Sequence, residues 1–326
     1  MSVRTIWFTK MLSKTGIAVL NALSSGREAT AQELTADTGN SRKQVYRVVD
    51  EMIEAGLVRE TRGHHNLRIV RATDDPVVEA YRRLASKLGH VAWPELLSPA
   101  TIRVCWFLNE PRRVTTIADR LGITRQAIHK ALTPLKNRAM LAPAGPEYAL
   151  ADDLRPLLEF ARAVVAHEHR VRVRALAPSA TVEWCDPKRA LVRVHDPEDT
   201  DTLQSAEDWE LTGLARFQTY GLRFFLAGEP AFWYAPDEPL TPADVVCHTL
   251  VLDADSRRAS YALLLIEQEG INREALTETA TWYGVEQTIS QMYSFLDEDV
   301  EAADEGGVCL PSPGEYAALK DQYGVT

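Results

Sequence analysis

An internal repeat constrains the fold of this 326-residue chain more than any other feature of its sequence. The segment "TAQELTADTGNSRKQVYRVVDEMIEAGLV" (30–58) resembles "VTTIADRLGITRQAIHKALTPLKNRAML" (114–141) at an offset of 83 residues without a gap. The matched positions are Leu34 with Ile117, Gly39 with Gly122, Ser41 with Thr124, Arg42 with Arg125, Val45 with Ile128, Val49 with Leu132 and Met52 with Leu135. The chain therefore contains two copies of one structural unit.

Each copy has the sequence pattern of two helices joined by a tight turn. A glycine, Gly39 or Gly122, marks the turn. The hydroxyl of Ser41 or Thr124 can accept a hydrogen bond from the free N–H groups that begin the second helix. A further helix is predicted before each pair, at 16–23 and 100–108, and a hairpin of two strands after it, at 57–70 and 140–150. Each copy is thus a helix-turn-helix followed by a hairpin.

This order of elements resembles the winged helix-turn-helix family, over roughly residues 10–72 and 94–150. The resemblance implies an α+β fold class, with two N-terminal winged helix-turn-helix domains followed by a C-terminal α+β domain. The predicted divisions are a first winged domain (1–73), a linker helix (74–93), a second winged domain (94–151), a connecting or dimerisation helix (152–177) and an acidic regulatory or partner-binding domain (178–326). The helix at 152–177 either packs on the domain that it follows or pairs with its copy in a homodimer.

The second helix of the first copy has an unusual order of charges. Its apolar side chains, Val45, Val48, Val49 and Met52, fall in one stripe, and Lys43, Arg47, Asp50 and Glu54 lie opposite. The exposed face is therefore basic first and acidic later, although the helix macrodipole favours the reverse order by about 0.3–1 kcal/mol per charge. A helix whose N-terminal residues enter the major groove of DNA needs cations there. The charge order therefore indicates a recognition helix.

The predicted contacts with double-stranded DNA come from both copies. In the first copy they are Ser41, Arg42, Lys43, Gln44 and Arg47 on the helix, and Arg59, Arg62, His64 and Arg68 on the hairpin. In the second copy they are Thr124, Arg125, Gln126, His129 and Lys130. Arginine and glutamine can each make two hydrogen bonds to a base edge. Pro134 lies inside the second recognition helix and is expected to kink or shorten it, which would make this copy a weaker DNA reader or a packing module.

The distribution of charge agrees with an anionic partner for the N-terminal half. Residues 1–175 hold 27 Lys and Arg against 18 Asp and Glu, whereas residues 176–326 hold 9 against 28. The first half therefore has a net charge of +9 and the second half of −19. No run of 18 uncharged apolar residues is present, so we expect a cytoplasmic protein with no membrane partner.

The sequence offers no convincing enzyme site or metal site. The four cysteines lie more than 60 residues apart, and the phosphate-binding and nucleophile motifs GxGxxG, Walker A and GxSxG are absent. The acidic segments "DPEDTDT" (196–202) and "LVLDADSRR" (250–258) are interpreted as turns that aspartate stabilises. The adjacent His64 and His65 have no nearby cysteine or carboxylate partner. We therefore predict no catalytic residue, metal or cofactor.

The C-terminal half is expected to mix strands and helices. The predictions are strands at 181–185 and 190–196 around a turn at Asp186-Pro187, a helix at 206–221, a hairpin at 222–235, and helices from 241 onward. In this half, "LTGLARFQTYGL" (211–222) and the Pro-led helix "PLTPADVVCHTLVL" resemble the C-terminal domain of AbiEi-type antitoxins. That family typically has one N-terminal winged helix, whereas this chain has two. The resemblance implies an autoregulating antitoxin whose partner is a nucleotidyltransferase-type toxin.

Together these features predict a sequence-specific DNA-binding transcriptional regulator that acts as a repressor. The alternative is a protein-interaction module, because three-helix units also dock protein partners. The dense aromatic residues at 217–235 fit a hydrophobic core most simply, with a ligand pocket or partner surface as the functional alternative.

Overall fold

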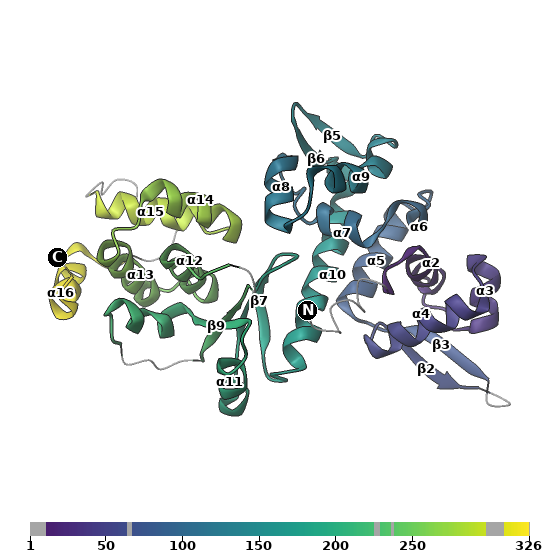
Figure 1. The fold of residues 1–326 in the computed structure, drawn as a ribbon, viewed down its shortest axis with the longest axis horizontal. Helices are drawn as coiled ribbons and strands as arrows, with labels where there is room; N and C mark the ends of the chain where they lie inside the picture. Colours follow the sequence, from purple (N-terminus) through teal and green to yellow (C-terminus); the bar gives the residue numbers. More distant parts are fainter. Residues whose placement is uncertain (1–10, 64–66, 225–228, 236–237, 298–309, 326) are drawn as a thin grey trace. The chain divides into compact units, whose positions relative to one another are not determined.

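The computed structural model describes residues 11–63, 67–224, 229–235, 238–297 and 310–325 (Figure 1). The chain forms two compact units. Unit 1 comprises Met1–Arg172 and Asp186–Lys188, and unit 2 comprises Val173–Cys185 and Arg189–Thr326. Both units combine helices with antiparallel sheet, so the predicted α+β fold class is confirmed. Within the described ranges, no helix has the length and apolar character needed to cross a membrane.

Residues 11–72 form what we call the first winged unit. Its elements are α2 (Lys14–Leu23), β1 (Ala29–Thr30), α3 (Ala31–Thr38), α4 (Arg42–Glu54), β2 (Val58–Arg62) and β3 (Arg68–Ala72). Gly39 ends α3 in the left-handed conformation, with φ of 64°, and Ser41 caps the start of α4. The four apolar residues predicted to face the core of this unit, Val45, Val48, Val49 and Met52, are fully buried.

Residues 97–150 form the second winged unit, and it repeats the same arrangement. Its elements are α7 (Pro99–Cys105), β4 (Arg112–Arg113), α8 (Val114–Leu121), α9 (Arg125–Lys136), β5 (Leu141–Ala144) and β6 (Glu147–Leu150). The sheet order β4-β6-β5 corresponds strand for strand to β1-β3-β2 of the first copy. The expected shortening at Pro134 is wrong, because α9 continues to Lys136 and the proline falls in its last turn.

Three further helices complete unit 1. They are α5 (Pro76–Lys87), α6 (Trp93–Leu96) and α10 (Arg155–Arg174), which follows the short 3₁₀ turn η2 (Asp152–Leu154). The predicted linker helix is confirmed as α5 over the first part of 74–93. It begins at Pro76, and the Asp75 carboxylate caps it by accepting a hydrogen bond from the Val77 N–H at 2.8 Å.

The apolar face of α10 is buried within the chain. Its Phe160 ring meets the ring of Tyr81 on α5 edge to face, with centroids 5.3 Å apart. Its Glu168 carboxylate binds Arg103 of α7 at 3.1 Å. Of the two roles predicted for this helix, packing within the chain or pairing in a homodimer, this arrangement agrees with the first.

Unit 2 has a four-stranded antiparallel sheet, in the order β7-β8-β10-β9. The strands are β7 (Thr181–Cys185), β8 (Ala190–Arg193), β9 (Trp209–Thr212) and β10 (Ala231–Tyr234). The helices are α11 (Pro197–Gln204), η3 (Gly213–Tyr220), α12 (Pro242–Leu252), α13 (Ser256–Gln268), α14 (Arg273–Tyr283), α15 (Glu286–Leu296) and α16 (Pro313–Tyr323). The predicted strands around Asp186-Pro187 are confirmed as β7 and β8.

Three predictions for unit 2 are wrong. The expected helix at 206–221 is strand β9 followed by the 3₁₀ helix η3, and the expected hairpin at 222–235 contains only β10 among its described residues. The reason is pairing with distant strands: β10 lies between β8 and β9, where Tyr234 is opposite Trp209 with ring centroids 5.0 Å apart. The segment 196–202 belongs mostly to helix α11, which Asp196 caps by accepting from the Glu198 N–H at 2.8 Å.

Candidate nucleic-acid interface

Two of the predicted DNA contacts, Ser41 and Gln44, hold the start of α4 in place. The Ser41 hydroxyl accepts a hydrogen bond from the Gln44 N–H at 3.4 Å. The Gln44 side-chain oxygen accepts from the Ser41 N–H at 3.2 Å and from the Ser41 hydroxyl at 2.8 Å. This reciprocal capping box satisfies N–H groups that the helix leaves free. We therefore assign both residues to positioning the helix.

The basic side chains at the start of α4 are exposed, as predicted. Arg42, Lys43 and Arg47 all lie on the solvent side. The Arg42 guanidinium donates a hydrogen bond to the Tyr46 hydroxyl at 3.3 Å and lies 5.3 Å from the centre of that ring. Arg47 is 3.7 Å from the Glu51 carboxylate. The cations are thus present at the N-terminal half of α4, although Arg47 has an acidic neighbour.

Arg68, another predicted DNA contact, is paired with two carboxylates within the first winged unit. Its guanidinium binds the Asp50 carboxylate of α4 at 2.5 Å and the Glu60 carboxylate of β2 at 2.8 Å. Its side chain is only 19% exposed and lies 5.8 Å from the centre of the Tyr46 ring. Arg68 therefore joins the hairpin to α4, and a phosphate would have to compete with both carboxylates for this guanidinium.

We expect Arg68→Ala to destabilise the first winged unit by about 1–2 kcal/mol, because it removes a largely buried guanidinium that joins the partly buried Glu60 to the exposed Asp50. Arg62→Ala is the matched control: its side chain is 60% exposed and pairs with Glu60 at 3.0 Å, so its loss should cost less than about 1 kcal/mol. Urea denaturation of the two variants measures the difference. Equal losses would contradict the structural role of Arg68.

The remaining hairpin residues are only partly described. Arg59 and Arg62 of β2 are exposed. His64 lies outside the described residues, as does His65. The contribution of these two histidines to DNA binding or to a metal therefore stays a prediction.

In the second copy the predicted contacts gather on one helix. Thr124 caps α9 by accepting a hydrogen bond from the Ala127 N–H at 3.2 Å. Arg125, Gln126, His129 and Lys130 are all exposed. The His129 ring lies edge to face with Tyr148 of β6, with centroids 6.3 Å apart. The start of α9 thus exposes two cations and one amide to solvent.

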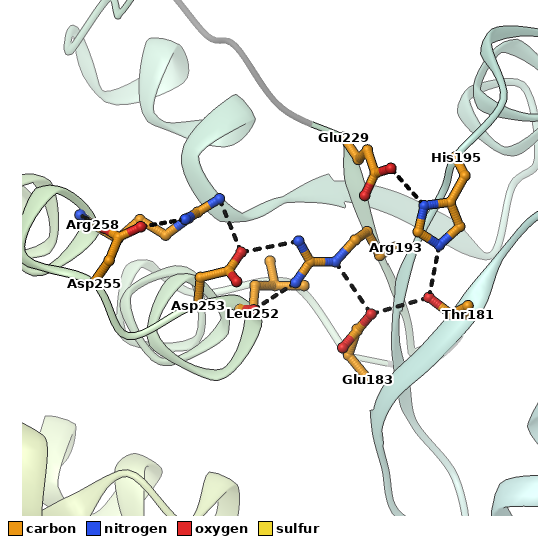
Figure 2. Close-up of polar contacts among 9 residues, drawn as sticks. All are labelled: Thr181, Glu183, Arg193, His195, Glu229, Leu252, Asp253, Asp255 and Arg258. Carbon is orange, nitrogen blue, oxygen red and sulfur yellow. Dashed lines mark hydrogen bonds and ion pairs between the residues drawn. The ribbon is translucent and has the colours of Figure 1, made fainter.

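In unit 2, the two aspartates of the acidic segment 250–258 are bound by arginines. Figure 2 shows Asp253 between Arg193 and Arg258, each at 2.9 Å. Asp255 binds Arg258 at 2.6 Å and caps α13 by accepting from the Arg258 N–H at 2.7 Å. Across the described ranges, no three His, Cys, Asp or Glu side chains come together as a metal site. Asp253 thus links the end of α12 to Arg193 at the end of β8, and Asp255 stabilises the start of α13.

A buried polar chain in unit 2 was not found from the sequence. The hydroxyl of Thr212 is 2.8 Å from Nδ1 of His248, and Nε2 of His248 is 3.0 Å from the hydroxyl of Tyr283. Tyr283 in turn donates to the Asp244 carboxylate at 2.9 Å. Because Tyr283 donates its proton to Asp244, Nε2 of His248 carries the proton that the tyrosine oxygen accepts, and Nδ1 accepts from Thr212. The only sequence signal was one histidine in the apolar segment "VVCHTLVL".

Burial explains the protonation state of this chain. Desolvation lowers the pKa of His248 to about 3, so the imidazole is neutral near pH 7. The His248 ring also lies against Trp233, with centroids 4.4 Å apart. Buried and hydrogen-bonded through both ring nitrogens, His248 connects β9, α12 and α14.

Comparison with known proteins concerns unit 2. A family model described as HVO_2833_C, C-terminal, matches residues 206–325, which include every element from β9 to α16. No curated protein matches the sequence. The matched segment begins at residue 206, well after α4 and α9 in the sequence. The similarity therefore concerns the C-terminal domain and does not include either winged unit.

Proposed function

We propose that the chain is a sequence-specific DNA-binding transcriptional regulator that represses by occupying promoter DNA. The observation that carries this proposal is the presence of two helices in one repeated frame, α4 and α9, with exposed cations in their N-terminal halves. A cation at the start of a helix opposes the macrodipole. A nearby phosphate would offset that cost.

Each helix has the parts that groove recognition needs. Buried apolar residues on one side fix its rotation, and the cap residues Ser41 and Thr124 fix its first turn. On the other side, Arg42, Arg125 and Gln126 are exposed and could reach base edges. The net charge of +9 over residues 1–175 supports an anionic partner.

A binding assay on the full chain tests this proposal. We expect the protein to prefer the duplex upstream of its own coding sequence over a scrambled duplex of equal composition. The double variant Lys43→Glu/Lys130→Glu should weaken this binding at least about tenfold, because it reverses two exposed charges at the proposed interface. Lys87→Glu, on the exposed side of α5 and outside both helix-turn-helix motifs, is the control and should bind as the wild type does.

Fluorescence anisotropy at two salt concentrations measures these affinities. Equal affinity of the double variant and the control would contradict the assignment of the interface. Wild-type protein that binds neither duplex, or binds with no dependence on salt, would overturn the proposed function in favour of protein docking by the winged units.

A further inference from the structure

The two winged units differ in how their cations are balanced. In the first, the ion pairs join Arg47 to Glu51, Arg62 to Glu60, and Arg68 to Asp50 and Glu60. Three arginines predicted to contact DNA thus already have carboxylate neighbours. Phosphate binding would have to compete with those carboxylates.

In the second winged unit, Arg112 pairs with Glu110 and Arg113 with Glu147, but four cations on α9 and directly after it have no such neighbour in the described part of the chain. Residues 121–146 contain no aspartate or glutamate. Arg125, Lys130, Lys136 and Arg138 are exposed, and no carboxylate of the described residues forms an ion pair with any of them. The positive charge of this surface is therefore fully available to an anion.

The repeat shows which substitutions separate the two surfaces. At the offset of 83 residues, Arg47 corresponds to Lys130, so the two helices share a cation at that position. The acidic residues of α4, which are Asp50, Glu51 and Glu54, correspond to Thr133, Pro134 and Asn137 of α9. The two helices therefore align without a gap, and only α4 has acidic residues in its C-terminal half.

We propose that the second winged unit makes the principal contact with the phosphate backbone of duplex DNA, and that the first unit contributes fewer phosphate contacts. This inference rests on the proposed function. Each neutralised phosphate adds about 0.9 to the slope of log affinity against log salt concentration. Four unpaired cations on the second unit can supply a slope of roughly 3 to 4. The carboxylates of α4 and β2 repel the DNA phosphate backbone. They therefore reduce the contribution of the first unit to the salt dependence of binding.

Two matched triple variants of the full chain test this division. Arg125→Gln/Lys130→Gln/Arg138→Gln removes three charges from the second unit, and Lys43→Gln/Arg47→Gln/Arg59→Gln removes three from the first. We expect the second-unit triple to lower the salt slope by about 2 to 3. The first-unit triple should lower it by about 1 to 2, because Arg47 already pairs with Glu51. The probe is a labelled mixed-sequence duplex about three helical turns long.

A second pair of variants exchanges the residues at one matched position of the two units. One of these variants should bind DNA more tightly than the wild type, a result that loss of folding could not produce. Glu54→Asn places in α4 the residue that α9 has at the matched position, and should strengthen binding to the same duplex roughly two- to fivefold at low salt. Asn137→Glu should weaken it by a similar factor. Both positions are exposed near the ends of their helices.

The outcomes separate this inference from the proposed function. A larger fall in slope for the first-unit triple, or equal falls for both, would overturn the inference and leave DNA binding intact. Unchanged binding in the reciprocal exchange would also overturn it. Wild-type protein that shows no salt-dependent binding to the duplex would overturn both proposals together.

Discussion

Replacing Phe160 by alanine should lower the free energy of unfolding of unit 1 by about 3–5 kcal/mol. The Phe160 side chain is fully buried on α10 and packs edge to face on Tyr81 of α5. Truncation removes the whole aromatic ring and leaves a cavity, which the surrounding helices can close only in part. Because α10 also binds α7 through Glu168 and Arg103, the loss should loosen the contacts of both winged units.

Hydrogen exchange resolved by segment, with urea denaturation, measures this effect. Arg162→Ala is the matched control on the same helix, because Arg162 is exposed and should change stability by less than about 0.5 kcal/mol. Protection of α5 and α7 should fall in Phe160→Ala and stay unchanged in the control. Phe160→Ala protein as stable as the control would show that α10 contributes little to unit 1.

Acidification should destabilise both units below pH 6.5, and His248 is the main titrating group of unit 2 in the upper part of that range. Burial lowers the pKa of His248 from its ordinary value of 6.5 to about 3. Between these values the unfolded chain binds a proton that the folded chain does not, so stability falls as the pH falls. Each pH unit in this window costs roughly 1.4 kcal/mol. In unit 1, burial and the charge of Arg172 lower the pKa of His169 to about 3 in the same way.

The variants His248→Gln and Tyr283→Phe separate titration from hydrogen bonding. His248→Gln removes the titrating group, so the stability of unit 2 should depend less steeply on pH between 6.5 and 5. Tyr283→Phe breaks the hydrogen bonds to His248 and Asp244 and should cost about 1–3 kcal/mol at every pH, with the wild-type slope retained. Urea denaturation at several pH values tests this, and a His248→Gln slope equal to that of the wild type would exclude His248 as the cause.

The helical parts of unit 1 were predictable because their signals are local. Gly39 and Gly122 lie within a few residues of the helices that they end, and Ser41 and Thr124 are adjacent to the helices that they cap. The repeat added a second, independent instance of each signal. The buried stripe of α4 also followed directly from its helical period.

The errors arose where distant residues decide the structure. β10 pairs with β8 and β9, so the segment 222–235 could not be understood from its own sequence. The ion pairs of Arg68 were likewise missed, because one of the carboxylates that bind it belongs to Asp50, 18 residues earlier in the chain. Local charge patterns show which cations exist, whereas only the fold shows which of them are already paired.

Under the proposed function, the tandem arrangement has a consequence for the DNA site that the chain would recognise. Regulators that bind as symmetric dimers present one recognition helix twice, and their operators are palindromic for that reason. Unit 1 instead contains two different helices in one polypeptide, with Lys43 in α4 where α9 has Gln126. A regulator built in this way can recognise an asymmetric operator, with two dissimilar half-sites and a defined direction relative to the promoter.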